Sequence, residues 1–220
     1  MQIEEEQKIR KEYGCFKKRL DFEEQIIRHE EIILQMDYAY GWANRMSYAI
    51  RRKVGAVLYK NRTPISCGYN GTSSGEDNCC EFEDLSGNLI TKDNVIHAEA
   101  NTLDKLAAFG SVTGAHNASI FTTTAPCMSC AIRIKNVLIS TVYFTEIYRS
   151  VSGIEHLIKH GITVNHVDLV TEEVTTIYQA KEDNDIDNKI ASIKKIREMF
   201  DSYADGIFHF PQVTTISTRK

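Results

Sequence analysis

The sequence contains no apolar run that approaches the ~20 residues needed to cross a bilayer. Its first stretch, MQIEEEQKIRKEYG, is highly charged and lacks the apolar centre of a secretory signal peptide. Internal repeats and low-complexity tracts are also missing. These absences predict a globular protein with no membrane partner and a cytoplasmic location.

An excess of positive charge is missing too. The 220 residues include 26 Lys and Arg against 30 Asp and Glu, which gives a formal net charge of −4. A chain with this balance has no overall basic field to attract nucleic acid. We therefore expect no large nucleic acid among its partners.

The cysteines are too unevenly spaced for a small disulfide-bonded scaffold. In a reducing compartment they are better explained as thiols or metal ligands. The six are Cys15, Cys67, Cys79, Cys80, Cys127 and Cys130. The adjacent pair Cys79–Cys80 cannot easily share one small metal site, so a packing role is favoured for it, and Cys15 and Cys67 have no special pattern.

Hydrophobic spacing predicts alternating helices and strands in the central part of the chain. Helices are predicted over 30–52, 97–109, 127–138 and 152–161, and strands over 54–59, 64–69, 118–123, 141–146 and 162–169. Residues 70–94 are rich in Gly, Ser, Asn and Asp and predict a long loop, which is usually functional or disordered. The alternation favours an α/β sandwich with parallel strands in its second half.

Two extensions flank the central domain of residues 30–170. Residues 1–29 are interpreted as a charged helical N-terminal extension. Residues 171–220 form a C-terminal extension, in which a polar break at 181–188 precedes apolar residues that recur every three or four positions. This recurrence predicts an amphipathic helix.

A group of possible metal ligands stands out from this background. Cys127 and Cys130 follow Pro126, which suits the first turn of a helix, where free amides favour thiolates. His97, also at a predicted helix start, lies 30 residues earlier (127 minus 97), which leaves room for one helix and one strand. We expect both helices to follow neighbouring parallel strands and to begin at one pocket.

Three protein ligands leave the fourth position of a tetrahedral zinc open, which is typical of a catalytic site. A water bound there has its pKa lowered to about 7. Glu99, two residues after His97, is close enough to carry protons without binding the metal. No second ligand set is visible, so we expect one zinc per chain.

Simpler interpretations compete with this one. A Cys-x-x-Cys pair also occurs in thioredoxin-type redox sites or as inert core thiols. A histidine at a helix start is often a cap or a core residue. Together, however, His-x-Glu and Pro-Cys-x-x-Cys match the signature of the zinc nucleobase deaminases.

Around this signature the sequence resembles the deoxycytidylate (dCMP) deaminases, particularly those of bacteriophage type. The matching blocks are KVGAVL (53–58), GYNG (68–71), NCCEFED (78–84), HAEAN (97–101), PCMSC (126–130) and VYFTEIYR (142–149). The resemblance covers residues 30 to about 168. It identifies 30–170 as a zinc-dependent deaminase domain.

The resemblance implies a cytidine-deaminase-like, three-layer α/β/α sandwich with a mixed five-stranded sheet. The site residues that it implies are the zinc ligands His97, Cys127 and Cys130, the proton shuttle Glu99, and the nucleotide contacts Asn70 and Ala98. The expected location becomes the host's cytoplasm if the chain is encoded by a phage.

The resemblance also implies regulation. Members of this family are commonly hexamers that are activated by dCTP and inhibited by dTTP. The segment from GYNG through NCCEFED resembles the region that binds the regulatory nucleotide, and Mg²⁺ is expected to accompany the triphosphate. The residues that this assigns to the regulatory site are Asn78, Cys79 and Glu83.

The predicted reaction is therefore hydrolytic deamination of dCMP to dUMP and ammonia. A monophosphate needs cationic or hydrogen-bonding donors, for which the candidates are Arg51, Lys53, Tyr148 and Arg149. Two alternatives stay open: a deaminase of another cytosine or adenine substrate, such as adenosine in tRNA, and a non-catalytic, zinc-stabilised module that senses nucleotides. Glu99 argues against the sensor, which would not need it.

Overall fold

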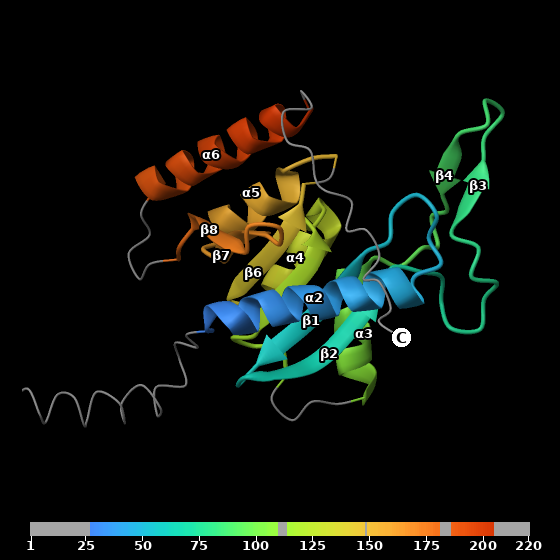
Figure 1. Ribbon diagram of the computed structural model, residues 1–220, viewed down its shortest axis with the longest axis horizontal. Helices are drawn as coiled ribbons and strands as arrows, with labels where there is room; N and C mark the ends of the chain where they lie inside the picture. Colours follow the sequence, from blue (N-terminus) through green and yellow to red (C-terminus); the bar gives the residue numbers. More distant parts are fainter. Residues whose placement is uncertain (1–26, 110–113, 148, 181–185, 205–220) are drawn as a thin grey trace, which may run out of the picture.

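The computed structural model describes residues 27–109, 114–147, 149–180 and 186–204 (Figure 1). In chain order the elements are α2 (His29–Met46), β1 (Gly55–Lys60), β2 (Thr63–Tyr69), β3 (Glu81–Glu83), β4 (Leu89–Thr91), α3 (Ala98–Phe109), β5 (Ser119–Thr124), α4 (Met128–Asn136), β6 (Thr141–Glu146), α5 (Ser152–Lys159), β7 (Thr163–Asp168), β8 (Glu173–Tyr178) and α6 (Ile186–Ala204). The helices and strands predicted for residues 30–170 are thus present. The helix predicted over 30–52 ends earlier, at Met46.

The main sheet is mixed, as expected, and has six strands in the order β2-β1-β5-β6-β7-β8. The central pairs β5–β6 and β6–β7 are parallel, whereas β1 pairs antiparallel with both β2 and β5. The sixth strand, β8, pairs antiparallel with β7 and corrects the prediction of five. As an edge strand that is partly exposed, β8 does not show the clean alternation that marks a half-buried strand.

The layers follow from alternation along the strands. On β1, Val57 and Tyr59 pack with Ile32 and Met36 of α2, which is the helix that covers that face of the sheet among the described residues. Their neighbours Ala56 and Leu58 point to the opposite face, into a core shared with residues of α3, α4, α5 and α6. The two cores confirm the three-layer sandwich (Figure 1).

The segment predicted as a loop, 70–94, contains a small hairpin. Strands β3 and β4 pair antiparallel and form a separate two-stranded sheet that projects away from the main one (Figure 1). The Asp84 carboxylate accepts hydrogen bonds from the backbone amides of Ser86 and Asn88, both at 2.8 Å, and thereby closes the turn. A bridge between Gly71 and Ile96 ties the base of the excursion together.

The predicted C-terminal helix is present as α6. Ile196 is fully buried in the main core, and Arg197 donates a 2.6 Å hydrogen bond to Glu155 of α5. Of the N-terminal extension, residues 1–26 lie outside the described residues. Among the described helices, none combines the length and the hydropathy needed to span a bilayer.

Candidate active site

Two helix starts converge on one pocket. Ala98 opens α3 directly after His97, and Cys127 is the N-cap residue of α4. The helix α4 follows β5, which runs parallel to β6, as expected. The helix α3 follows the hairpin excursion instead of a strand of the main sheet, so the expected pair of strand-fed helices is wrong for α3.

Close backbone packing fixes both helix starts. A Cβ atom at Gly68 on β2 would lie 2.9 Å from the carbonyl oxygen of Ala98, so this glycine lets the strand approach the first turn of α3. A Cβ atom at Gly153 of α5 would lie only 2.0 Å from the carbonyl oxygen of Pro126. The segment that carries Cys127 is therefore held against α5 at a distance that excludes any side chain.

The three predicted metal ligands come together. The ligand atoms of His97, Cys127 and Cys130 all lie within 4.8 Å of one another, and they are the only such group among the described residues. His97 Nδ1 is 3.4 Å from each of the two sulfurs. A tetrahedral zinc with bonds of about 2.3 Å to sulfur and about 2.1 Å to nitrogen separates such atoms by about 3.6 Å. The donor set and its spacing therefore fit zinc.

Hydrogen bonds among the three side chains shift their pKa values in different directions. A hydrogen bond from Cys130 lowers the pKa of the Cys127 thiol to about 3, which makes Cys127 a thiolate at neutral pH. The same hydrogen bond, together with burial, raises the pKa of Cys130. The hydrogen bond with Cys127 also raises the pKa of His97.

Glu99 lies on the first turn of α3 and is only 4% exposed. It lines the same pocket as His97 and Cys127. Burial raises the pKa of its carboxyl group. The structure therefore places a buried carboxyl group beside the three ligands, at the position that the sequence predicted for a proton carrier.

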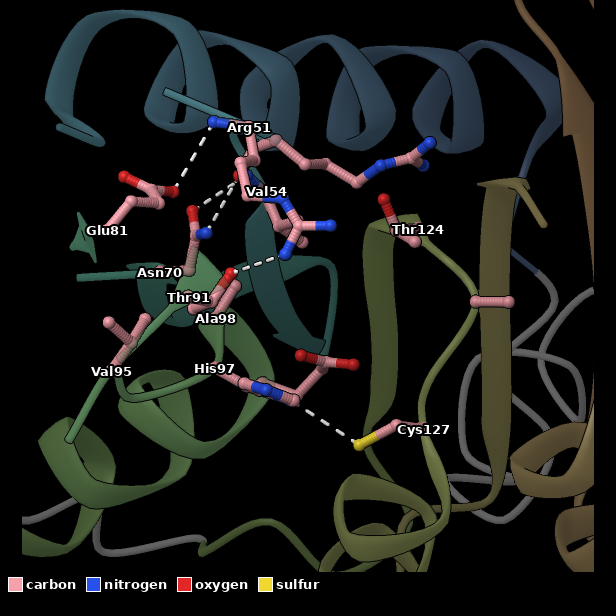
Figure 2. Close-up of a pocket in the computed structure, with 13 residues that line it drawn as sticks. Arg51, Val54, Asn70, Glu81, Thr91, Val95, His97, Ala98, Thr124 and Cys127 are labelled. Atoms are coloured by element: carbon pink, nitrogen blue, oxygen red, sulfur yellow. Dashed lines mark hydrogen bonds between the residues drawn. The ribbon is translucent and has the colours of Figure 1, made fainter. Parts of the chain in front are cut away.

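The pocket is a cavity of about 90 Å³ between α3 and the carboxyl end of β5. Figure 2 shows His97 and Cys127 at one end and Arg51, Glu81 and Thr91 at the other. The lining residues are Arg51, Arg52, Val54, Asn70, Glu81, Thr91, Val95, His97, Ala98, Glu99, Thr124, Ala125 and Cys127. Of the predicted nucleotide contacts, Asn70, Ala98 and Arg51 are among them.

The side chain of Asn70 forms hydrogen bonds mainly with other parts of the protein. Its side-chain oxygen accepts hydrogen bonds from the amide of Val54 and the hydroxyl of Ser47, both at 2.8 Å. Its side-chain nitrogen donates to the carbonyl oxygen of Arg52 at 2.9 Å (Figure 2). Asn70 therefore holds the segment before β1 in place, which leaves one of its N–H groups for a ligand.

The other phosphate candidates lie elsewhere. Lys53 Nζ donates to the carbonyl oxygen of Asn44 at 3.3 Å and does not line the pocket. Arg149 is exposed and does not line it either. Tyr148 lies outside the described residues.

Sequence reasoning missed two polar residues at this end of the pocket, namely Glu81 and Thr91, and considered a third, Arg52, only as part of the basic cluster RRK at 51–53. Arg52 donates a 2.7 Å hydrogen bond to Glu146, whose carboxylate also accepts one from Tyr40. Glu81 and Thr91 belong to the hairpin that was predicted as a loop. The only available signal was their membership of the segment 70–94.

The three residues assigned to a regulatory site lie apart from the pocket. Asn78, Cys79 and Glu83 are exposed and lie on or beside β3. Cys79 Sγ is 3.3 Å from the carbonyl oxygen of Glu81, which places this thiol at the start of the hairpin. Their assignment to a regulatory nucleotide stays a prediction.

Comparison with known proteins agrees with this geometry. Residues 30–146 match the family model of the cytidine and deoxycytidylate deaminase zinc-binding region. ComE operon protein 2 of Bacillus subtilis is 33% identical over 54% of this chain and 62% of its own length. Deoxycytidylate deaminase of Saccharomyces cerevisiae is 34% identical over 57% of this chain and 41% of its own length. The chain thus spans less than two thirds of the length of these curated relatives.

A solved structure matches more fully. The dCMP deaminase of the cyanophage S-TIM5, crystallised with dCMP and dUMP, superposes with a TM-score of 0.59 at 33% identity. The match covers 64% of this chain and 99% of the cyanophage chain. The family model covers more than half of the chain, and the ligand atoms of His97, Cys127 and Cys130 lie within 4.8 Å of one another. The chain therefore belongs to the cytidine and deoxycytidylate deaminase family.

Proposed function

We propose that this chain deaminates dCMP to dUMP and ammonia. The observation that carries the proposal is the buried carboxyl group of Glu99 beside a His-Cys-Cys ligand set, in a pocket that has an arginine at its other end. The cyanophage dCMP deaminase, which holds dCMP and dUMP in its crystals, supports this choice of substrate. The identification of Glu99, His97, Cys127 and Cys130 as the working residues is part of the proposal.

Zinc bound by three protein ligands supplies a water with a pKa lowered to about 7, which is a nucleophile at neutral pH. The role of Glu99 is to move protons. Its carboxylate takes a proton from the attacking water and delivers it to N3 of cytosine. It then takes the proton of the new C4 hydroxyl and delivers it to the amine, which leaves C4 as ammonia. Because the side chain is buried, solvent does not compete for this proton.

The start of α3 provides the second contact to the base. The first amides of a helix have no partner within the helix, and the first backbone hydrogen bond here runs from Asn101 to His97. The amides of Ala98 and Glu99 are therefore oriented toward the pocket end of α3. We assign them to the carbonyl oxygen of the pyrimidine.

Arg51 is the residue that we assign to the 5′-phosphate. Its guanidinium lines the pocket and donates to the neutral hydroxyl of Thr91 at 3.2 Å, so its charge is not cancelled by that partner. The neighbouring Arg52 forms a 2.7 Å ion pair with Glu146. An arginine that keeps its charge uncompensated is better suited to a dianionic phosphate.

The test is a comparison of substrates. Ammonia release and dUMP formation are measured with purified, zinc-loaded protein and dCMP, CMP, dCTP, deoxycytidine or adenosine. We expect dCMP to be the best substrate. Deamination of an adenine substrate alone would establish a different reaction, and binding of dCMP without ammonia release would make the chain a nucleotide sensor.

One zinc per chain is the stoichiometry that we propose. The described residues contain one group of three clustered ligands, and Cys67, Cys79 and Cys80 are free thiols outside it. Elemental analysis of the purified protein measures the ratio directly. Two zinc ions per chain would contradict the single-site proposal.

We also propose a homo-oligomer, a hexamer by resemblance. Leu34, Tyr38 and Met46 are 61%, 43% and 42% exposed and recur at multiples of four along one face of α2. Such a stripe is more typical of an interface than of a solvated helix. Light scattering of the wild type and of Leu34→Glu tests it: the variant should dissociate, and a monomeric wild type would contradict the proposal.

We also propose that nucleoside triphosphates regulate the enzyme. In this proposal dCTP activates it and dTTP inhibits it, and each binds with Mg²⁺ near Asn78, Cys79 and Glu83. The exposure of these residues outside the pocket supports a separate site. An activator shifts the population toward the competent state, so dCMP saturation should be sigmoidal alone and hyperbolic with dCTP. Hyperbolic curves that neither triphosphate alters would show that the enzyme is unregulated.

A further inference from the structure

One cross-strand pair of the small hairpin holds Arg51 at two points. Glu81 and Thr91 lie directly opposite each other in the β3–β4 register. The Glu81 carboxylate accepts the backbone amides of Ile50 and Arg51, at 3.1 and 3.3 Å. Thr91 accepts a 3.2 Å hydrogen bond from the guanidinium of the same arginine (Figure 2).

Burying the carboxylate of Glu81 costs free energy unless other groups compensate its charge. Its side chain is only 7% exposed, and a buried carboxylate must be compensated by partners. Within the described part of the chain no basic group lies at ion-pair distance from Glu81, and its recorded partners are the two backbone amides. The buried charge is therefore used to fix the backbone of residues 50 and 51.

The side chains on that backbone are not held in place by burial. Ile50 is 73% exposed and Arg51 is exposed too, in the bend between α2 and β1. A free arginine side chain loses rotamer entropy when a ligand orders it. Contacts that order the side chain beforehand remove part of that cost from binding.

We infer that Glu81 and Thr91 are positioning residues that hold Arg51 for the substrate's 5′-phosphate and so set the preference for a nucleotide over a nucleoside. The inference rests on the proposed function for the identity of the base. It gives the β3–β4 hairpin a definite role, because the hairpin brings both contacts to Arg51 through one residue pair. Neither residue is proposed to touch the substrate.

The experiment measures binding and turnover separately. Binding of dCMP and of deoxycytidine is measured by calorimetry on the full, zinc-loaded chain, and kcat and KM are measured for both substrates. The variants are Thr91→Val, Glu81→Gln, Arg51→Ala and the two double variants with Arg51→Ala. Glu76→Gln is the matched control, because Glu76 is an exposed residue of the same excursion whose carboxylate accepts a hydrogen bond from Asn94.

We expect Thr91→Val and Glu81→Gln each to weaken dCMP binding about 2- to 10-fold, the range for one or two hydrogen bonds. KM for dCMP should rise by the same factor, while kcat and deoxycytidine binding stay unchanged. In the Arg51→Ala background both changes should have no further effect, since the residue through which they act is gone. Glu76→Gln should match the wild type.

Three results would overturn the inference: equal weakening of dCMP and deoxycytidine, persistence of the effects in the Arg51→Ala background, or a wild type that binds both ligands equally. Thr91→Val removes one hydroxyl without a buried charge, so it decides the matter if Glu81→Gln fails to fold. If the variants lower dCMP binding selectively but the wild type releases no ammonia, the proposed reaction fails and the positioning role stands.

Discussion

The two ends of the pocket are built in different ways. At the metal end, His97 and Cys127 lie at the starts of α3 and α4. Glycines, which have no side chain, let neighbouring backbone pack closely against these helix starts. At the opposite end, Arg51 stands in an exposed bend and is held by a hairpin outside the main sheet. The residues proposed to carry out the chemistry thus lie on helices packed tightly in the core, and the residue proposed to bind the phosphate is held by a peripheral hairpin. Changes at the two ends should therefore have separable consequences.

The largest effect is expected at the metal end, from Glu99→Gln. The amide keeps the shape of the side chain but cannot carry protons, and general acid–base catalysis contributes roughly 10²–10⁴-fold. We expect kcat to fall by at least this range, with zinc content unchanged, as measured by steady-state kinetics and elemental analysis. Retention of more than about a tenth of the activity would remove Glu99 from the mechanism.

Packing at the same end should be the next most sensitive feature. In Gly153→Ala the new methyl group must displace the backbone of Pro126 and Cys127, and a misplacement of about 1 Å can cost about 10²-fold in rate. We expect activity and zinc affinity to fall together. Gly41→Ala is the matched control, since Gly41 lies in α2 with no atom within 4 Å of the added carbon. Equal behaviour of the two variants would show that this contact is not critical.

The other end should respond differently to Arg51→Ala. Loss of a charge-assisted hydrogen bond costs about 1.5–3 kcal/mol, so KM for dCMP should rise by about 10- to 150-fold with little change in kcat. The phosphate is remote from C4 and is held equally in the ground and transition states. Lys53→Ala is the control, because Lys53 donates to Asn44 and does not line the pocket. A larger effect of Lys53→Ala than of Arg51→Ala would move the phosphate site.

The smallest effect is expected from His166 on β7. His166 Nε2 lies 2.7 Å from the carbonyl oxygen of Thr145, next to the Glu146 that pairs with Arg52. Burial lowers the pKa of His166 below its usual value of about 6.5. The unfolded chain therefore binds a proton more readily, so this contribution to stability is complete above pH ~6.5 and is lost as the pH falls through the lowered pKa.

Thermal unfolding between pH 7.5 and 5 measures this contribution. We expect His166→Gln to show a shallower fall of Tm with acidification than the wild type. A change of 1 kcal/mol shifts Tm by about 2–4 °C for a chain of this size, which sets the precision needed. Parallel curves for the two proteins would show that His166 does not contribute.

The metal end could be predicted from the sequence because each ligand belongs to a short local motif. A helix start places Cys127 and Cys130 together, and the same rule places Glu99 beside His97. The separation of 30 residues then needed only one helix and one strand, which are α3 and β5. The central strands could also be predicted from the sequence. Because β1 and β5 are buried on both faces, their sequences are nearly continuous runs of apolar or β-branched residues.

The other end could not be predicted in this way. Arg51 contacts Thr91, 40 positions away, through a hairpin of two three-residue strands inside a polar segment. Strands this short give no periodic signal. Which of Arg51, Lys53 and Arg149 reaches the pocket depends on the direction of its side chain. For Arg51 the hairpin and the bend determine that direction. The edge strand β8 was missed for a related reason, since its outer residues face solvent.

The most direct test of the two-part pocket is the ratio of kcat/KM for dCMP to that for deoxycytidine, measured side by side in the wild type, Glu99→Gln and Arg51→Ala. We predict that Glu99→Gln lowers both values by the same factor and leaves the ratio unchanged. Arg51→Ala should lower the value for dCMP alone and reduce the ratio by about 10- to 150-fold. If Arg51→Ala lowers both values equally, or if Glu99→Gln changes the ratio as strongly, the two ends do not work separately and the account is wrong.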